Sequence, residues 1–354
     1  MPSPTRRAAA RPSPASTTLG TLCRAAPAPR EREDPAPTGP RRARPEDRLR
    51  AGWVRVAPPS SKLRSFSREG AERSKAGKGN LQEGRRMTIR VAIGGFGAIG
   101  KVVAQRLDRE LEGLTLAAVA ARDVARAEAA MAGLMRPVPV VPLAQLWEHA
   151  DVVVECAPAA VLRELVEPAL GNGRIVMVLS CGALLDNFDL VDLARRNGGR
   201  ILVPTGALLG LDGVIAAAEG GIASVNMISR KPPQGLLGAP YLVAHGIGIT
   251  GLAEPKRVFS GTAREAARGF PANVNVAAAL ALAGTGPDRT TVEIWADPTI
   301  TRNIHRIEVE AAAARLSMQV ENVPSDDNPR TGRLTALSVI AALKKLSSPL
   351  AIGT

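Results

Sequence analysis

Three glycines at a fixed spacing are the first residues of this sequence that point to chemistry. Gly95, Gly97 and Gly100 form the pattern Gly-x-Gly-x-x-Gly between the apolar run 88–94 and the helix-like segment 101–107. Such a turn is typical of dinucleotide sites, because it lets the backbone approach a pyrophosphate and the helix N-terminus offers free N–H groups. We predict that the turn binds NAD or NADP through the following residues: Gly95, Gly97, Ala98, Ile99 and Gly100.

The choice between NAD and NADP is usually made at the end of the second strand of such a fold. An acidic residue there binds the adenosine ribose, whereas an arginine accommodates the 2′-phosphate of NADP. Here the strand-like run 114–120 is followed by Ala121, Arg122 and Asp123. Arg122 either pairs with a 2′-phosphate or is a solvated loop charge, and Asp123 can still reach a ribose. We therefore predict that both cofactors are tolerated, with Arg122 in the cofactor site.

The chain has three histidines, so few imidazoles could serve as an acid or a base. His149 is predicted at a helix end away from the carboxyl ends of the strands, and His245 in a glycine-bounded loop. His305 lies in a strand-like run, in which Asn303, His305 and Ile307 would share one face. A polar face of this kind is unusual for packing alone, so His305 is the candidate catalytic imidazole, with a structural position in the strand as the alternative.

Two further groups of polar residues are candidates for ligand contacts. Arg230 and Lys231 stand at a predicted strand end before two prolines, as carboxylate-binding cations or as a solvated basic turn. Asn273 and Asn275 begin an alanine-rich helix. One asparagine is enough to cap that helix, so the other is free to face a ligand.

These residues need a sheet to bring them together. Between residues 87 and 208, apolar strand-like runs (114–120, 151–156, 174–179 and 200–203) alternate with helix-like segments (124–135, 158–170 and 187–196). Continuous apolar strands between helices indicate a parallel sheet covered on both faces, with ligands at the carboxyl ends of its strands. Small turn-forming residues follow those strands, and Ala157 is one of them, so we place it at the cofactor.

The domain organisation follows from a change in the pattern of strand-like and helix-like runs after residue 208. The runs 225–230, 290–295 and 303–309 are strand-like and have fewer helices between them. We predict an α/β protein with a Rossmann-type domain over 87–208 and a smaller α+β catalytic domain over 209–330. A helix within 331–354 is expected to pack back on the first domain.

Residues 1–86 have a different composition. They carry 20 of the 46 lysines and arginines and 8 of the 33 acidic residues, a net charge of +12, which leaves +1 for residues 87–354. They also hold 12 of the 28 prolines and show no hydrophobic periodicity, which predicts disorder. A transit peptide, a basic interaction tail and a start site assigned upstream of a true start at Met87 are the alternatives, and we favour the last. The nearly neutral remainder argues against nucleic acid as a partner.

Several other classes of protein are disfavoured. Cys23, Cys156 and Cys181 have neither the spacing of a metal site nor that of a disulfide framework. No run is apolar and long enough to cross a membrane, and no secretory signal is visible. We expect a cytoplasmic protein without a metal or a membrane partner.

In a series of motifs the sequence resembles the L-aspartate dehydrogenase family. The motifs are residues 94–100, 154–158, 179–184, 204–213, 230–233, 270–278, 297–298 with 303–307, and 321–324 with 328–331. The resemblance covers residues 87–354 and none of 1–86. It implies that His305 is the catalytic histidine and that Ala207 and Asn275 contact the nicotinamide cofactor.

The resemblance also implies a reaction. L-aspartate would be oxidised at Cα to iminosuccinate, which hydrolyses to oxaloacetate and ammonia or feeds NAD biosynthesis. His305, near its ordinary pKa, would take the proton of the substrate amine. Substrate binding would fall to Arg230, Lys231 and Asn303, with Arg302 and Arg306 as further candidates. A homodimer built through the open sheet of the second domain is implied as well.

Other interpretations of the sequence remain. One is a different two-domain reductase, of the homoserine dehydrogenase or dihydrodipicolinate reductase type. The paired-histidine motif followed by a lysine that characterises the second type is absent from this sequence. Another is a protein that binds a dinucleotide without catalysis.

Overall fold

The computed structural model describes residues 88–325 and 332–354. The predictions of a disordered extension over 1–86 and of a start at Met87 fall outside the described residues. All described residues belong to one compact unit. None of the helices in these two ranges has the length and apolar character needed to cross a membrane.

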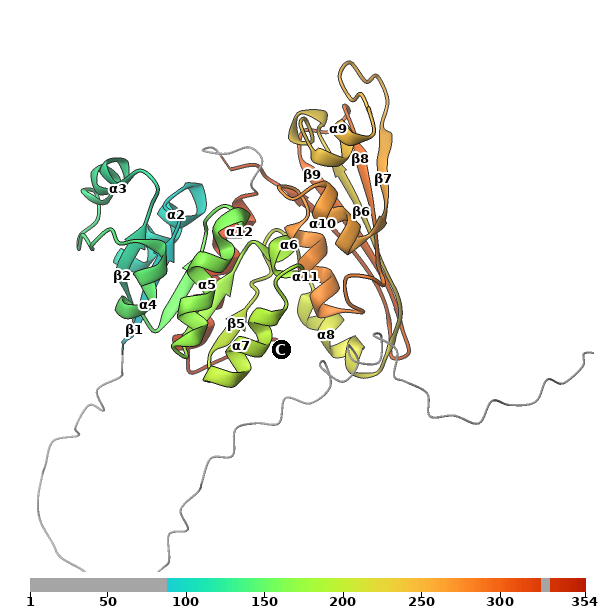
Figure 1. The fold of residues 1–354 in the computed structure, drawn as a ribbon. Helices are drawn as coiled ribbons and strands as arrows, with labels where there is room; N and C mark the ends of the chain where they lie inside the picture. The colour runs from blue at the N-terminus through green and yellow to red at the C-terminus, as the bar shows by residue number, and fades with distance from the viewer. Residues whose placement is uncertain (1–87, 326–331) are drawn as a thin grey trace, which may run out of the picture. The chain divides into compact units, whose positions relative to one another are not determined.

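The first half of this unit is built on a five-stranded sheet, sheet A (Figure 1). All its strand pairs are parallel. In spatial order the strands are β2 (Leu114–Ala120), β1 (Ile89–Gly94), β3 (Val152–Glu155), β4 (Ile175–Val178) and β5 (Arg200–Leu202). This arrangement confirms the predicted Rossmann-type sheet, whose strands are unbroken apolar runs because helices cover both faces.

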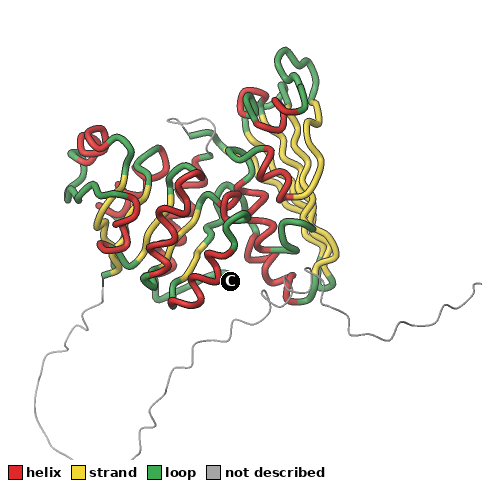
Figure 2. The backbone as a smooth tube through the Cα atoms, viewed as in Figure 1, coloured by secondary structure: helices red, strands yellow, loops and turns green. Residues whose placement is uncertain are grey.

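Helices alternate with these strands along the chain (Figure 2). They are α2 (Ala98–Arg109), α3 (Val124–Met131), α4 (Leu146–His149), α5 (Leu162–Gly171), α6 (Cys181–Leu184) and α7 (Asp189–Asn197). Helices α4, α5 and α7 share one apolar cluster with the sheet, and α2 shares another with the C-terminal helix α12 (Arg333–Ser347). The helix predicted over 124–135 is shorter than expected: α3 ends at Met131.

The second half contains sheet B, also of five strands. In spatial order these are β10 (Arg315–Asn322), β9 (Asn303–Ala311), β6 (Ile222–Lys231), β8 (Thr290–Ala296) and β7 (Lys256–Thr262). Among the strand pairs described for sheet B, β6–β8 is parallel and the others are antiparallel. The sheet contains the three strands predicted over 225–230, 290–295 and 303–309, and adds β7 and β10, which were not predicted.

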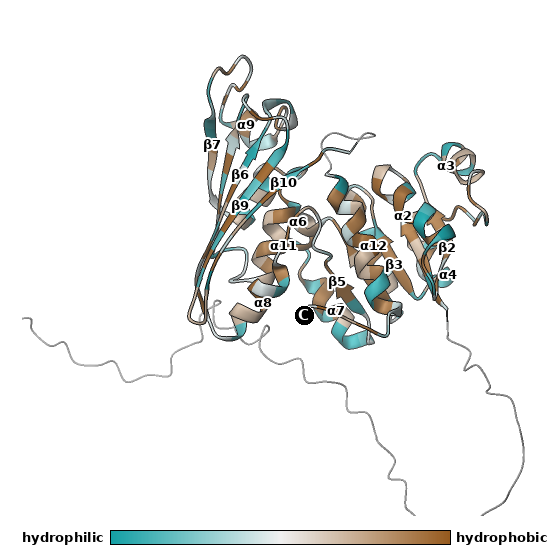
Figure 3. Ribbon diagram, turned by 180° about the vertical axis from the view of Figure 1, so that it is seen from behind, coloured by the Kyte–Doolittle hydropathy of each residue, from teal (hydrophilic) through white to brown (hydrophobic). Residues whose placement is uncertain are grey.

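The second half holds more helix than we predicted. Its helices are α8 (Leu211–Glu219), α9 (Pro240–Ala244), α10 (Ala263–Gly269) and α11 (Asn275–Ala283). Helices α8, α10 and α11 pack on one face of sheet B in a single apolar cluster. Helix α11 is mainly hydrophobic (Figure 3), because it also contacts α6 from the first half. A helix buried on several sides has weak periodicity, which hides it among apolar runs.

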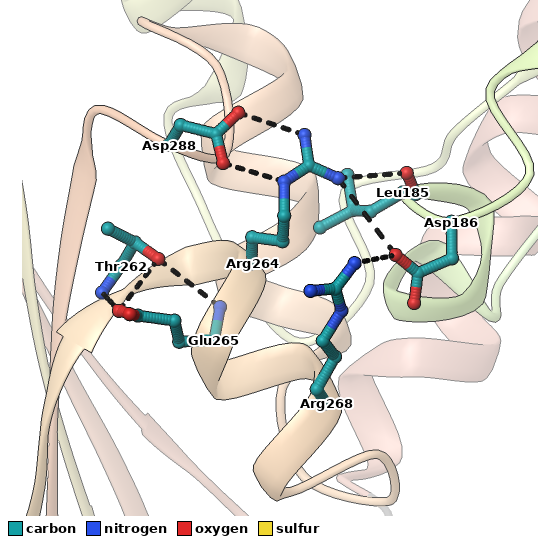
Figure 4. Close-up of polar contacts among 7 residues, drawn as sticks. All are labelled: Leu185, Asp186, Thr262, Arg264, Glu265, Arg268 and Asp288. Atoms are coloured by element: carbon teal, nitrogen blue, oxygen red, sulfur yellow. Dashed lines mark hydrogen bonds and ion pairs between the residues drawn. The ribbon is translucent and has the colours of Figure 1, made fainter.

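An arginine cluster ties the two halves together (Figure 4). Arg264 in α10 holds both carboxylate oxygens of Asp288 (Nε–Oδ1 2.6 Å, Nη2–Oδ2 2.9 Å) and donates to the backbone oxygen of Leu185, 3.1 Å away. Arg264→Ala should lower the free energy of unfolding by about 1–3 kcal/mol, because partly buried charged hydrogen bonds are lost. Chemical denaturation measures this effect. The more exposed Arg268, with one ion pair to Asp186, is the control, and its alanine variant should lose at most about 1 kcal/mol. Equal losses would contradict the assignment.

Candidate active site

A cavity of about 150 Å³ lies between the carboxyl end of sheet A and one face of sheet B. Its walls come from the start of α2, the turns after β4 and β5, the start of α11, and strands β6, β9 and β10. The predicted site residues that line it are Ile99, Ala207, Lys231, Asn275, Asn303 and His305. These six come from five separate stretches of the chain, which the fold brings to one place.

The glycine turn has the shape that a dinucleotide needs. Gly95 has a φ of +100°, and a Cβ there would lie 2.5 Å from the backbone oxygen of Cys156 and 2.7 Å from the amide nitrogen of Ala157. A Cβ at Gly100 would lie 2.1 Å from the backbone oxygen of Gly95, so strand and helix are in close contact. A Cβ at Gly97, by contrast, would meet no atom within 4 Å. The turn is therefore tight on two sides and open at Gly97, where α2 begins with Ala98.

The end of β2 lies beside this turn, since the amide of Gly95 donates to the backbone oxygen of Ala120 (2.8 Å). Arg122 is exposed there, and its side chain has no hydrogen bond or ion pair with another described residue. Asp123 caps α3 by accepting from the amide of Arg126 (3.0 Å). The arginine is thus available to a ligand, whereas the aspartate already has a structural role.

His305 lies on the face of β9 that lines the cavity, as the alternation Asn303, His305 and Ile307 predicts. Its side chain is buried, and Nδ1 lies 3.0 Å from Oγ of Ser229, its direct partner in the β6–β9 register. Burial, together with the nearby charge of Lys231, lowers the pKa of His305 to about 3. The expectation of an ordinary pKa was therefore wrong for the free protein, because the sequence does not show how closely the ring is enclosed.

Among the described residues, Lys231 is the one lysine or arginine that lines this cavity. It is 4% exposed, and it has neither a hydrogen bond nor an ion pair with another residue of the described ranges. Burial lowers its pKa to about 8. A buried amine without an anionic partner inside the fold is suited to an anionic ligand.

The other predicted cations lie elsewhere. The side chain of Arg230 lies on the face of β6 opposite to that of Lys231, and it pairs with the buried carboxylate of Asp297 (Nη2–Oδ2 2.8 Å). Arg306 donates to Glu308 (2.8 Å), and Arg302 is exposed. None of the three lines the cavity.

Asparagines from three elements line the cavity, and two of them hold its walls. Oδ1 of Asn275 accepts from the amide of Gly182 (3.1 Å), joining α11 to α6 rather than capping α11. Nδ2 of Asn322 donates to the backbone oxygen of Ala207 (2.9 Å). Oγ of Ser338 accepts from the amide of Gly206 (3.0 Å), so the turn after β5 is held from two sides.

Three residues at the cavity or its walls were not predicted from the sequence: Ser229, Asn322 and Ser338. Ser229 stands two residues before Lys231, and period-two alternation would have placed it on the same face. Asn322 lies in the motif 321–324, but it ends a strand that was not predicted, and Ser338 lies inside a helix without a local signal. No grouping of three or more histidine, cysteine or acidic side chains suited to a metal occurs in residues 88–325 and 332–354.

A parallel sheet with an open glycine turn, joined to an α+β half that supplies a buried histidine and lysine, defines a class of protein. It is that of the nicotinamide-nucleotide-dependent oxidoreductases. Comparisons with known proteins agree. Residues 95–204 match the family model described as homoserine dehydrogenase, NAD binding domain. Residues 212–346 match the model described as aspartate dehydrogenase, C-terminal.

Individual relatives narrow the class to a family. The chain is 62% identical over 266 residues to an L-aspartate dehydrogenase of Bradyrhizobium diazoefficiens, covering 75% of this chain and 94% of that protein. It is 58% identical over 270 residues to L-aspartate dehydrogenase 3 of Bordetella bronchiseptica, covering 76% and 99%. The crystal structure of aspartate dehydrogenase from Thermotoga maritima shares the fold, with a TM-score of 0.57, 24% identity, and coverage of 75% and 99%. The chain belongs to the L-aspartate dehydrogenase family.

Proposed function

We propose that this protein oxidises the CH–NH2 group of L-aspartate to iminosuccinate with NAD or NADP, and that iminosuccinate then hydrolyses to oxaloacetate and ammonia. The observation that carries the proposal is the 62% identity to a named L-aspartate dehydrogenase over 94% of its length. The homoserine dehydrogenase match covers the nucleotide-binding half alone. The half that supplies His305 and Lys231 matches aspartate dehydrogenase.

The glycine turn and the cavity fit a nicotinamide dinucleotide. Gly95, Gly97 and Gly100 with the start of α2 would hold its phosphates, and Ala157 lies against the turn. Ala207 and Asn275 would hold the nicotinamide end, since both line the cavity. When bound, the cofactor supplies the hydride acceptor. Arg122 is exposed beside the turn and available to a 2′-phosphate, which supports use of both cofactors.

The substrate side of the cavity has one cation and one base. We assign Lys231 to a substrate carboxylate and Asn303 to a hydrogen bond with it. His305 accepts the proton that the substrate amine must lose before a C=N bond can form, releases that proton to solvent, and as a neutral base then activates the water that attacks the imine. Two carboxylates beside the imidazole favour its charged form, so a bound substrate raises the low pKa of His305 toward the working range.

Lys231→Met should weaken substrate binding and stabilise the fold. KM for aspartate should rise about 10–100-fold, since a hydrogen bond between charged groups is lost. In the wild type, KM should rise as the pH passes 8, where Lys231 loses its proton. Because the unfolded chain keeps that proton up to about pH 10.5, burial of the cation destabilises the fold below pH 8.

The variant should therefore gain up to about 3 kcal/mol in free energy of unfolding at pH 7, at ~1.4 kcal/mol per pKa unit. Steady-state kinetics and chemical denaturation measure the two effects. Lys344→Met, at an exposed position of α12, is the control and should change neither quantity. A loss of stability with unchanged KM would remove Lys231 from the substrate site.

Two further proposals concern the metabolic use of the product and the oligomeric state of the protein. Iminosuccinate would supply NAD biosynthesis, as the resemblance implies.

We also propose a homodimer formed through the face of sheet B opposite α8, α10 and α11. That face carries half-buried apolar side chains at Ile228, Trp295 and Ile304, and sedimentation equilibrium measures the assembly.

One assay tests the proposed activity. The full chain is mixed with NAD or NADP and, separately, with L-aspartate, D-aspartate, L-glutamate and L-homoserine at alkaline pH, and reduced nicotinamide is followed by absorbance. We expect reduction with L-aspartate and with both cofactors. Reduction with homoserine instead, or with none of the four, would reject the proposed substrate.

A further inference from the structure

Ser229 is the residue that touches the imidazole of His305. The two side chains face each other across the antiparallel β6–β9 pair, and Oγ lies 3.0 Å from Nδ1. Both are nearly enclosed, with 4% of Ser229 and 2% of His305 exposed. Among the described residues, Nδ1 is the one side-chain partner of the Ser229 hydroxyl.

The other ring nitrogen has a different environment. Nε2 of His305 has no hydrogen-bond partner in the described ranges, and it is not among the fully buried polar atoms that lack one. Since His305 lines the cavity, Nε2 is the nitrogen that the cavity can reach. Nδ1 is therefore bonded within the fold, whereas Nε2 is available to a ligand in the cavity.

We propose that Ser229 is a positioning residue that holds Nδ1 of His305, so that the ring exchanges protons with the cavity through Nε2 alone. A hydroxyl can donate to a bare Nδ1 or accept from a protonated one, so it stays bonded when the ring gains or loses a proton. A carboxylate at this position would instead favour the charged ring. The neutral hydroxyl orients the ring without adding that bias, and this role rests on the proposed function of His305.

Nitrogen NMR of the imidazoles tests the proposal without substrate. The chain has three histidines, so the His305 signals are assigned by replacing His149 and His245 one at a time. We expect the neutral tautomer with its proton on Nδ1 to predominate at pH 7 in the wild type, because Nε2 must be bare to accept a proton from the cavity. Ser229→Ala should give a mixture of both tautomers, and Ser229→Thr, which keeps the hydroxyl, should restore the single one.

The kinetic readout separates positioning from binding. Ser229→Ala should lower kcat for aspartate about 5–10-fold, the effect of one lost neutral hydrogen bond in a buried site, while KM changes little. Ser224→Ala, in the same strand but paired with Glu310, should match the wild type. A single tautomer in Ser229→Ala, or an unchanged kcat, would overturn the proposal. The two proposals can fail separately. If the wild type does not oxidise aspartate but Ser229→Ala still changes the tautomer of His305, the proposed substrate is rejected and the positioning role of Ser229 stands.

Discussion

Replacing His305 with alanine should lower kcat for aspartate oxidation by about 10²–10⁴-fold, the usual contribution of a positioned acid or base. The imidazole is the proton acceptor that we assign in the cavity, and an alanine side chain has no group that can take its place. Because Lys231 keeps its charge, KM for aspartate should change far less than kcat. Steady-state kinetics over a range of pH values measures both quantities.

The matched control for that variant is His245→Ala. His245 is exposed and stacks on Tyr241, with ring centroids 4.0 Å apart, at a place remote from the cavity lining. It should keep the wild-type kcat. A loss of less than tenfold in His305→Ala would remove the imidazole from the acid–base step, whatever the substrate.

Gly97→Val should weaken cofactor binding without harming the fold. The backbone at Gly97 has φ −89° and ψ −157°, which other residues adopt, and a Cβ there meets no protein atom within 4 Å. The added side chain instead fills the space through which a pyrophosphate approaches the start of α2. An overpacking cost of about 1–3 kcal/mol would raise Kd for NAD about 5–150-fold. Fluorescence titration with reduced cofactor measures Kd.

Gly248→Val provides the comparison for Gly97→Val. Gly248 is exposed and lies away from the cavity, and a Cβ at this position would also meet no atom within 4 Å. The variant should retain the wild-type Kd. Equal Kd and equal Tm in Gly97→Val and the wild type would show that the turn holds no phosphate.

The fold of the first half could be predicted because its signals are local. Each buried strand, such as Val152–Glu155, is a short apolar run with turn residues at its ends, and the glycine spacing identifies the turn to α2. In the second half, β10 has exposed and half-buried residues in alternation, Arg315 to Glu321, at the edge of its sheet. Such a strand has a weak apolar signal, and it was missed.

The site could be predicted in part. The period of two along β9 placed His305 and Asn303 on one face, and both line the cavity. The neighbours Arg230 and Lys231 could not be separated by residue type, since both are cations at one strand end. Their opposite faces decide the matter: one pairs with Asp297, and the other is buried at the cavity. The contact between Ser229 and His305 joins residues 76 positions apart, so it required the β6–β9 register.

Transfer of the Cα hydrogen is the measurement that tests the central proposal most directly. The full chain is incubated with oxidised cofactor and L-aspartate that carries deuterium at Cα, and the reduced nicotinamide is examined by mass spectrometry. We predict one deuterium in each reduced cofactor, with oxaloacetate and ammonia formed in equal amounts. Reduced cofactor without deuterium, or no reduction with L-aspartate under conditions in which another amino or hydroxy acid is oxidised, would contradict the proposed function.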